Sequence, residues 1–480
     1  MKKSLLLAAM AGIALSSNAQ GVDPAVYEAK EGLELKNVWL MSLGNKENGV
    51  AMDAWAKVTQ MAANPGKATT ATRIGDYVYI ACSQDWVPMV DENGNPFDGL
   101  DHLSHLVVLN ANTGEIVKDL KLTLDGAQYE GLIAANCIGH DDFGHLWITP
   151  YVSNCYDATT NEAKPINLYM VNTETGEMTL VYGFEFDEIE GPTAGGRIDY
   201  CDVLGNLVGD EDGCSFMAIP NESAKAYIWV KYEGTDEWDL TAEGSNVVEV
   251  KDTYPANQGA WNYSPMGAFV HEEGNYEANF FWIDGHTTNP ALYDITGELI
   301  SSHATHAADD NEETPGPWAG FIPDRQANGM RQFTLGGEEY LAYAMVFPDD
   351  SKMGGHVAIV KLDNNGGLED ATPLWTAPAA KLGIAKGEGR FSHSIDVTPV
   401  MKDENGKEAV EIMIYKDMNG VGVYRLQQEG FQAGVNDIVV DNSNAPVEYF
   451  NLNGVRVNGE LVPGLYITRQ GTNVNKVIVK

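Results

Sequence analysis

An apolar strand, a polar turn ending in glycine and a second apolar strand recur along this chain. Residues 106–122, "LVVLNANTGEIVKDLKL", and residues 168–184, "LYMVNTETGEMTLVYGF", are two copies of the unit. A second kind of glycine turn follows the opening strand of each repeat and recurs every 61 to 69 residues. Turns at regular spacing between β-branched runs predict short antiparallel strands, so the chain is expected to be all-β and repetitive. The opening turns are at Gly75, Gly144, Gly205, Gly274, Gly337 and Gly406, and the later turns are at Gly114, Gly176, Gly234, Gly297 and Gly366.

These turns divide the chain into six units of four strands. A four-stranded sheet cannot bury both of its faces alone, but sheets arranged radially around an axis bury each face against a neighbour. We therefore predict a six-bladed β-propeller over residues 33–427, with a seven-bladed ring containing one degenerate blade as the alternative. The sixth unit supplies only three clear strands, so residues 33–43, "LELKNVWLMSL", are expected to be its outer strand and to close the ring. Blades of this pattern resemble those of quinoprotein-like and other bacterial propellers, a resemblance at the level of fold only.

The beginning of the chain has the pattern of an export signal. Residues 1–19 start with Lys2 and Lys3, continue through the apolar run "LLLAAMAGIAL" and end on small residues. A run this short does not span a bilayer, whereas a cleaved secretory signal has this three-part form. No other segment is apolar enough for a membrane span. We expect an exported protein whose mature chain begins near Gln20.

The end of the chain adds a second indication of location. Residues 446–480 contain "YFNLNGVRV", "GLYI" and a basic, β-branched "KVIVK" ending. Asn453-Gly454 between alternating apolar strands is a strong hairpin signal. The segment resembles the C-terminal sorting domain of proteins exported by type IX secretion. It implies a small β-sandwich-like domain over residues 437–480 after a linker at 428–436, and a cell-surface or extracellular protein, with the periplasm as the alternative.

Composition excludes several classes of function. The formal charge of −39 repels phosphate backbones and anionic lipid, so binding to nucleic acid or to a membrane surface is not expected. The sequence has no G-x-S-x-G, H-E-x-x-H, Walker A or dinucleotide-binding pattern. The five cysteines form no C-x-x-C pair; Cys201 and Cys214 could bridge, but isolated buried thiols are the favoured interpretation.

Arginines and aromatic residues mark the face on which we expect a ligand. Only eight arginines occur, and five of them lie in or beside predicted blade-to-blade connections, opposite the glycine turns. An arginine fork grips carboxylate or phosphate through two donors, and loop aromatics stack on sugars. The alternative is that these side chains tie neighbouring blades together or pack over them. The candidate ligand-binding residues are Arg73, Arg197, Arg325, Arg331, Arg390, Trp86, Trp261, His286, Trp318 and His393.

Catalysis and metal binding have weaker signals. Two loop carboxylates at a suitable separation could hydrolyse a glycoside, but a chain with 69 acidic residues places some in loops by chance. His303-x-x-His306 could be half of a metal site, although a solvated loop is the favoured interpretation. The acidic loops 91–99 and 209–213 lack the full ligand spacing of a calcium loop, so no cofactor is predicted and Ca²⁺ stays an open alternative. The acid–base candidates are Asp85, Asp284, Asp349, Asp350, Glu388 and Asp417.

We therefore expect a secreted or surface propeller that binds a glycan or another small anionic ligand through its arginine- and aromatic-bearing face. One alternative is a glycan-degrading hydrolase or lyase that uses loop carboxylates. Another is a non-catalytic scaffold that binds a surface protein. Fold alone does not decide between them, because propellers host binders and enzymes alike.

Overall fold

The structure is a computed structural model of the chain. It describes residues 23–42, 70–82, 104–129, 133–150, 156–157, 162–184, 198–208, 213–220, 225–231, 238–239, 246–250, 266–271, 274, 276–284, 289–306, 316–322, 329–345, 356–379, 393–416, 420–433, 447–450, 464–470 and 473–479.

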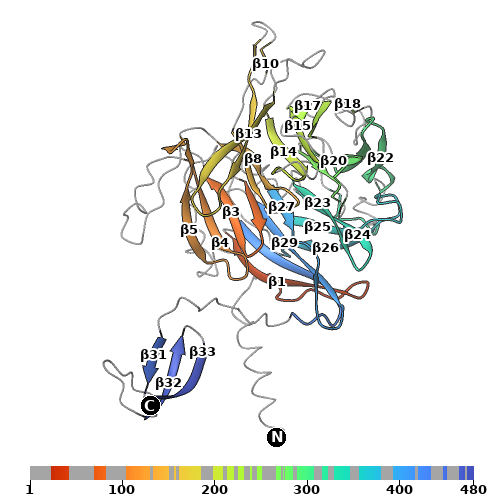
Figure 1. Cartoon of the computed structure of the whole chain (residues 1–480). Coiled ribbons are helices and arrows are strands. Elements are labelled where there is room, and N and C mark those ends of the chain that lie inside the picture. Colours follow the sequence, from red (N-terminus) through yellow and green to blue (C-terminus); the bar gives the residue numbers. More distant parts are fainter. Residues whose placement is uncertain are drawn as a thin grey trace. The chain divides into compact units, whose positions relative to one another are not determined.

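Six antiparallel sheets form the blades of a β-propeller, as the turn spacing predicts (Figure 1). In each blade the inner strand pairs with the second strand, and each inner strand contacts the inner strand of at least one neighbouring blade around the propeller axis. The inner strands of blades 1 to 6 are β2 (Ala71–Ile74), β8 (Ile133–His140), β14 (Ile198–Gly205), β19 (Met266–Phe269), β23 (Met330–Leu335) and β27 (His393–Val397).

The remaining strands build each blade outward. The second strands are β3 (Tyr77–Cys82), β9 (Leu146–Pro150), β15 (Cys214–Pro220), β20 (Phe280–Asp284), β24 (Glu338–Met345) and β29 (Glu408–Lys416). The third are β4 (His105–Asn110), β12 (Ile166–Val171), β16 (Lys225–Lys231), β21 (Ala291–Asp294), β25 (His356–Lys361) and β30 (Gly420–Gln428). The outer strands are β5 (Ile116–Lys121), β13 (Glu177–Phe184), β17 (Trp238–Asp239) with β18 (Asn246–Glu249), β22 (Leu299–Ser302), β26 (Thr372–Ala377) and β1 (Leu33–Ser42).

Short elements complete the set. They are β6 (Thr123–Leu124) and β7 (Ala127–Gln128), which extend the outer edge of blade 2, the two-stranded sheet of β10 (Tyr156–Asp157) and β11 (Glu162–Ala163), β28 (Met401–Lys402), and the 3₁₀ helix η3 (His303–His306).

Blade 6 combines the two ends of the propeller sequence. Its strand order is β1-β30-β29-β27, and β1 pairs antiparallel with β30 from Leu33 opposite Gln428 to Ser42 opposite Gly420 (Figure 1). This is the position expected for residues 33–43. The early strand covers the edge of β30, which would otherwise present unpaired backbone groups.

The core lies between the blades. Buried side chains form six hydrophobic clusters among the described residues, one at each interface between neighbouring blades. On β24, Tyr340 and Ala342 pack in the interface with blade 6, whereas Leu341 and Tyr343 pack in the interface with blade 4. Successive residues of a strand point to opposite faces, so a strand buried on both faces is apolar throughout.

The repeated Asn-x-x-Thr-Gly-Glu segment is the turn between the third and outer strands. In blade 2 the Asn172 side-chain oxygen accepts hydrogen bonds from the backbone N–H groups of Glu174 and Thr175, which fixes the turn. Gly176 follows at φ 78°, and a Cβ there would lie 2.1 Å from the carbonyl oxygen of Lys121. The motif recurs because this turn needs it, so its recurrence does not indicate a ligand site.

The chain divides into two compact units. One comprises Met1–Met401 with Glu408–Glu429, and the other comprises Lys402–Lys407 with Gly430–Lys480. The described strands of the second unit form one antiparallel sheet in the order β31 (Val447–Phe450), β32 (Gly464–Gln470) and β33 (Asn473–Val479). The Asn453-Gly454 hairpin turn and the signal at residues 1–19 lie outside the described residues, so the sandwich-like sorting domain and the export signal stay predictions.

Candidate functional site

Most of the predicted ligand-binding residues lie outside the part of the chain that the structure describes. They are Arg197, Arg325, Arg390, Trp86, Trp261 and His286, and for His393 only the backbone, as the first residue of β27, is described. Their role stays a prediction. The structure shows the side chains of Arg73, Arg331 and Trp318.

Arg73 is a buried structural residue. It lies near the end of β2, and its Nε donates to the carbonyl oxygen of Gly75, so its side chain is at a glycine turn and not on the opposite face as expected. Its Nη2 lies 2.5 Å from Glu411, which also accepts hydrogen bonds from Arg425 at 2.9 and 2.5 Å. This pairing joins blade 1 to blade 6, which is the structural alternative for this arginine.

Trp318 is also enclosed by protein. Only 2% of its surface is exposed, and its ring stacks on His306 at 4.2 Å and meets the edge of His303 at 5.4 Å. His303 is itself fully buried, and His306 lies 2.6 Å from the carbonyl oxygen of Leu368. The expectation that His303-x-x-His306 occupies a solvated loop is therefore wrong: the motif forms η3 and packs around the indole.

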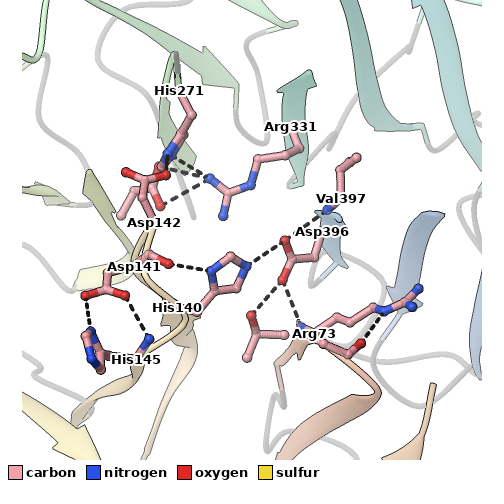
Figure 2. Close-up of polar contacts among 12 residues, drawn as sticks. Arg73, His140, Asp141, Asp142, His145, His271, Arg331, Asp396 and Val397 are labelled. Atoms are coloured by element: carbon pink, nitrogen blue, oxygen red, sulfur yellow. Dashed lines mark hydrogen bonds and ion pairs between the residues drawn. The ribbon is translucent and has the colours of Figure 1, made fainter. Parts of the chain in front are cut away.

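Arg331, the second residue of β23, reaches across the propeller axis. Its Nη1 lies 3.4 Å from both carboxylate oxygens of Asp202 in blade 3 and 3.0 Å from Nε2 of His271 in blade 4. Among the described residues, its Nε and Nη2 have no hydrogen-bond partner, and 15% of the side chain is exposed. Figure 2 shows that the contacts of this guanidinium with the neighbouring side chains all come from one of its nitrogens.

Acidic and histidine side chains from other inner strands surround Arg331. Nδ1 of His271 lies 2.8 Å from Oδ1 of Asp142, whose Oδ2 accepts a hydrogen bond from the backbone of Gly205. Nε2 of His271 lies 3.5 Å from Asp202, which accepts a 2.8 Å hydrogen bond from the backbone N–H of Phe269. The turn after β8 is thereby joined to β14 and to the end of β19.

A second set of contacts joins blades 2, 1 and 6. His140, the last residue of β8, places Nδ1 2.8 Å from the carbonyl oxygen of Asp141 and Nε2 3.2 Å from Oδ1 of Asp396 (Figure 2). Oδ2 of Asp396 accepts hydrogen bonds from the Thr72 hydroxyl at 2.7 Å and the Arg73 backbone at 2.8 Å. We call His140, Asp142, Asp202, His271, Arg331 and Asp396 the axial network; every blade contributes a side chain or a backbone group to its contacts.

Burial and opposite charges together set the ionisation of the axial network. Burial lowers the pKa of His271, but its bonds to Asp142 and Asp202 more than offset this and raise the pKa to about 9. The pKa of His140 is also raised, because the Asp396 carboxylate outweighs burial. Burial raises the pKa of Asp396, but His140 and Arg331 hold it well below its usual range.

At the other two carboxylates and at the guanidinium, neighbouring opposite charges also outweigh the effect of burial on the pKa. Burial raises the pKa of Asp202, and Arg331 and His271 lower it below its ordinary value. The pKa of Asp142 is likewise lowered, chiefly by His271 against burial. Asp202, Asp396 and Asp142 raise the pKa of Arg331 despite burial. Near neutral pH the axis therefore holds three carboxylates together with the charged Arg331 and the protonated His271.

Of the six predicted acid–base residues, the structure describes only Asp284. Asp85, Asp349, Asp350, Glu388 and Asp417 lie outside the described residues. Asp284, at the end of β20, is fully buried, and burial raises its pKa well above the ordinary value although the Gly329 backbone acts to lower it.

Metal ligands and membrane-spanning segments are not evident in the described part of the chain. It contains no group of three or more His, Cys, Asp or Glu side chains arranged to hold a metal ion. It also contains no helix with the length and apolar character needed to cross a membrane. Cys201 and Cys214 are buried and form no disulfide, as the sequence favoured.

Sequence reasoning missed five members of the axial network: His140, Asp142, Asp202, His271 and Asp396. A usable signal was present, because these polar residues lie at or near the ends of otherwise apolar inner strands, close to the opening glycine turns. Four of the five stand within four residues of Gly144, Gly205 or Gly274.

Comparisons with known proteins place the chain by fold. No family model and no curated protein matches it. The chain is similar to the crystal structure of a DUF4623 family protein from Bacteroides eggerthii, with a TM-score of 0.51 and 15% identity over 84% of this chain and 77% of that one. At this identity the similarity shows the propeller fold and does not show activity.

Two structures of glycan-active proteins resemble the chain more weakly. An α-L-arabinofuranosidase from Fusarium graminearum matches with a TM-score of 0.38 and 11% identity over 77% of this chain and 96% of that one. A polysaccharide lyase of family PL25, an ulvan lyase, matches with a TM-score of 0.33 and 10% identity over 85% and 92%. TM-scores this low support no inference about the chemistry of this chain. The chain is thus a six-bladed β-propeller with a polar, partly accessible cluster of charges at its axis.

Proposed function

We propose that this protein binds an acidic glycan at the propeller axis, and that Arg331 holds the anionic group of the sugar. The observation that carries the proposal is the half-used guanidinium: among the described residues, only Nη1 of Arg331 forms hydrogen bonds or ion pairs. Nε and Nη2 form the side of the fork that binds a carboxylate or sulfate through two parallel hydrogen bonds.

The mixed charge of the axial network supports a sugar as the ligand class. A sugar acid carries one anionic group and several hydroxyls, which need acceptors. Asp142 and Asp202 lie beside Arg331 as carboxylates and supply such acceptors. A polyphosphate or nucleic acid would meet three carboxylates at the axis and a formal charge of −39 over the whole chain.

Partial exposure of the network agrees with ligand access. Side chains of Arg331, His271, Asp142 and His140 are 15 to 26% exposed, whereas those of Asp202 and Asp396 are 5% exposed. The more accessible groups are the donors and acceptors that a ligand would meet, and the more buried carboxylates hold them in place.

The test compares acidic with neutral oligosaccharides. Tetragalacturonate is expected to raise the melting temperature of the wild-type protein, and maltotetraose is expected to leave it unchanged. Arg331→Gln should weaken tetragalacturonate binding by about 10- to 100-fold, because one charge-assisted contact is worth about 1.5–3 kcal/mol. Arg425→Gln is the matched control, since Arg425 contacts Glu411 and does not belong to the axial network. Equal affinity of wild type and Arg331→Gln for the acid would refute the proposal.

A specific observation also favours a second function, cleavage of the same glycan. Asp142 and Asp202 flank opposite nitrogens of one imidazole, so they lie within the separation of about 10 Å at which paired carboxylates can act. Their lowered pKa values make both ionised at neutral pH, so His271 would have to be the proton donor. Incubation with polymeric substrate separates the two functions: cleavage releases new reducing ends, and binding alone does not.

The proposal includes a location at the cell surface or outside the cell. It rests on the signal-like residues 1–19 and the sorting-like tail at 446–480. Fractionation of expressing cells tests it, since deletion of residues 446–480 should move the protein from the surface fraction to the periplasm.

A further inference from the structure

Two cations share one carboxylate in the axial network. Nη1 of Arg331 lies 3.4 Å from each oxygen of Asp202, and Nε2 of His271 lies 3.5 Å from Oδ2. Charge-assisted hydrogen bonds are normally about 2.7–2.9 Å long, so neither cation makes a full bond to this carboxylate. The one short bond of Asp202 in the network comes from the backbone of Phe269 at 2.8 Å.

The two cations also contact each other. Nη1 of Arg331 lies 3.0 Å from Nε2 of His271. This contact is a hydrogen bond only while Nε2 carries no hydrogen, because arginine nitrogens can only donate. Nδ1 of His271 already donates to Asp142 at 2.8 Å, so the neutral ring can accept from Arg331 and the charged ring cannot.

Protonation of His271 therefore changes what Arg331 can do. A hydrogen on Nε2 repels the guanidinium and needs an acceptor, and the nearest carboxylate is Asp202. The charged groups that face His271 are Asp142 from the turn after β8, Asp202 from β14 and Arg331 from β23, and Asp396 and His140 lie beyond Arg331 (Figure 2).

We propose that His271 is a positioning residue for Arg331: the protonated imidazole takes Asp202 as its partner, and the guanidinium is released to bind the anionic group of an acidic sugar. This inference rests on the proposed function and specifies how its binding site is switched on. It also predicts linkage in the reverse direction, since a bound anion draws Arg331 from Asp202 and so favours the protonated form of His271.

The sign of the pH dependence follows. Binding uses the protonated imidazole, whose pKa is about 9, so affinity is full at neutral pH and is lost as the pH rises above this value. The sugar carboxylate is ionised over the whole range and contributes no slope. Above pH 9 the affinity should fall by up to about tenfold per pH unit, the limit for one linked proton.

The test measures the dissociation constant of tetragalacturonate by calorimetry at pH 7, 8, 9 and 10. Wild type should bind equally at pH 7 and 8 and more weakly at pH 10, with proton uptake near pH 9 seen as a dependence of the heat on the buffer. His271→Arg keeps a charged donor at every pH used, so it should bind at pH 7 and keep its affinity to pH 10. His271→Gln has no charge, so it should bind about tenfold more weakly at pH 7 and show no slope.

The possible outcomes separate this inference from the proposed function. Absence of tetragalacturonate binding by wild type at every pH overturns both. Binding by wild type with no loss up to pH 10, or a His271→Arg variant that loses affinity in parallel with wild type, overturns the role of His271 and leaves the binding function standing. If His271→Gln fails to fold in a thermal melt, the comparison of wild type with His271→Arg still decides.

Discussion

Replacement of Asp396 should remove the contacts that join blades 6, 1 and 2 and should lower the stability of the propeller. The side chain is 5% exposed and accepts hydrogen bonds from Thr72 and the Arg73 backbone, which are both buried. It also lies 3.2 Å from His140. Asp396→Ala leaves two buried donors without partners and breaks a largely buried ion pair, so we expect a loss of roughly 4–6 kcal/mol in the free energy of unfolding.

Asp396→Asn distinguishes the hydrogen bonds from the charge. The amide oxygen can still accept from Thr72 and Arg73, so this variant should lose only about 1–3 kcal/mol, mainly the charge toward His140. Asp363→Asn is the matched control, because Asp363 accepts three backbone N–H groups at a turn on the surface and a change there should cost less than about 1 kcal/mol.

Urea unfolding followed by tryptophan fluorescence at pH 7 measures these differences. The folded pKa of Asp396 lies below its unfolded value, so its contribution is present above about pH 4 and is lost as the pH falls further. Wild type should therefore lose its advantage over Asp396→Asn in acid. The reasoning is refuted if Asp396→Ala unfolds at the same urea concentration as wild type.

Three further variants test other parts of the fold. Gly176→Ala should cost more than 2 kcal/mol, because its Cβ would meet the Lys121 carbonyl at 2.1 Å, whereas Gly126→Ala, with similar positive φ and open space, should cost about 1 kcal/mol; urea unfolding compares them. Asp284→Asn should reduce the loss of wild-type stability as the pH rises from 5 to 9, since the raised pKa of Asp284 makes its ionisation destabilising; equal slopes would contradict this. Asp23→Ala removes the acceptor for side chains of Tyr27, Asn37 and Tyr424, so it should cost about 2–4 kcal/mol and speed hydrogen exchange over residues 23–32 in mass spectrometry.

The fold was predictable because its signals are local. Every blade has an opening glycine turn, and four described blades also have an Asx-type turn such as Asn172 to Gly176; both conformations depend on a few adjacent residues. Closure by residues 33–43 followed from counting strands, since the sixth unit lacked an outer strand and β1 had no other partner.

The axial network was only partly predictable. Arg331 was found because arginine is rare in this chain, but its partners Asp202 and His271 stand 129 and 60 residues away. Their meeting depends on ring closure, which no local pattern encodes. The His303-x-x-His306 prediction failed for a related reason: a polar sequence around two histidines suggested solvent, whereas Trp318 packs against both rings.

Arg73 was expected on the face of the propeller opposite the glycine turns, but its side chain lies at the Gly75 turn. Its place beside the Gly75 turn could be read from the sequence. Its partner Glu411, however, lies 338 residues away in β29, the second strand of blade 6. Two arginines on inner strands, Arg73 and Arg331, thus have different surroundings. Nη2 of Arg73 is paired with a buried carboxylate from the neighbouring blade, whereas Nε and Nη2 of Arg331 have no hydrogen-bond partner among the described residues.

A crystal structure of the protein with tetragalacturonate tests the central claim most directly. The account predicts one sugar carboxylate within hydrogen-bond distance of Nε and Nη2 of Arg331, with Nε2 of His271 moved to within about 3 Å of Asp202. An oligosaccharide bound elsewhere on the propeller, with Arg331 still in contact with His271, would contradict it.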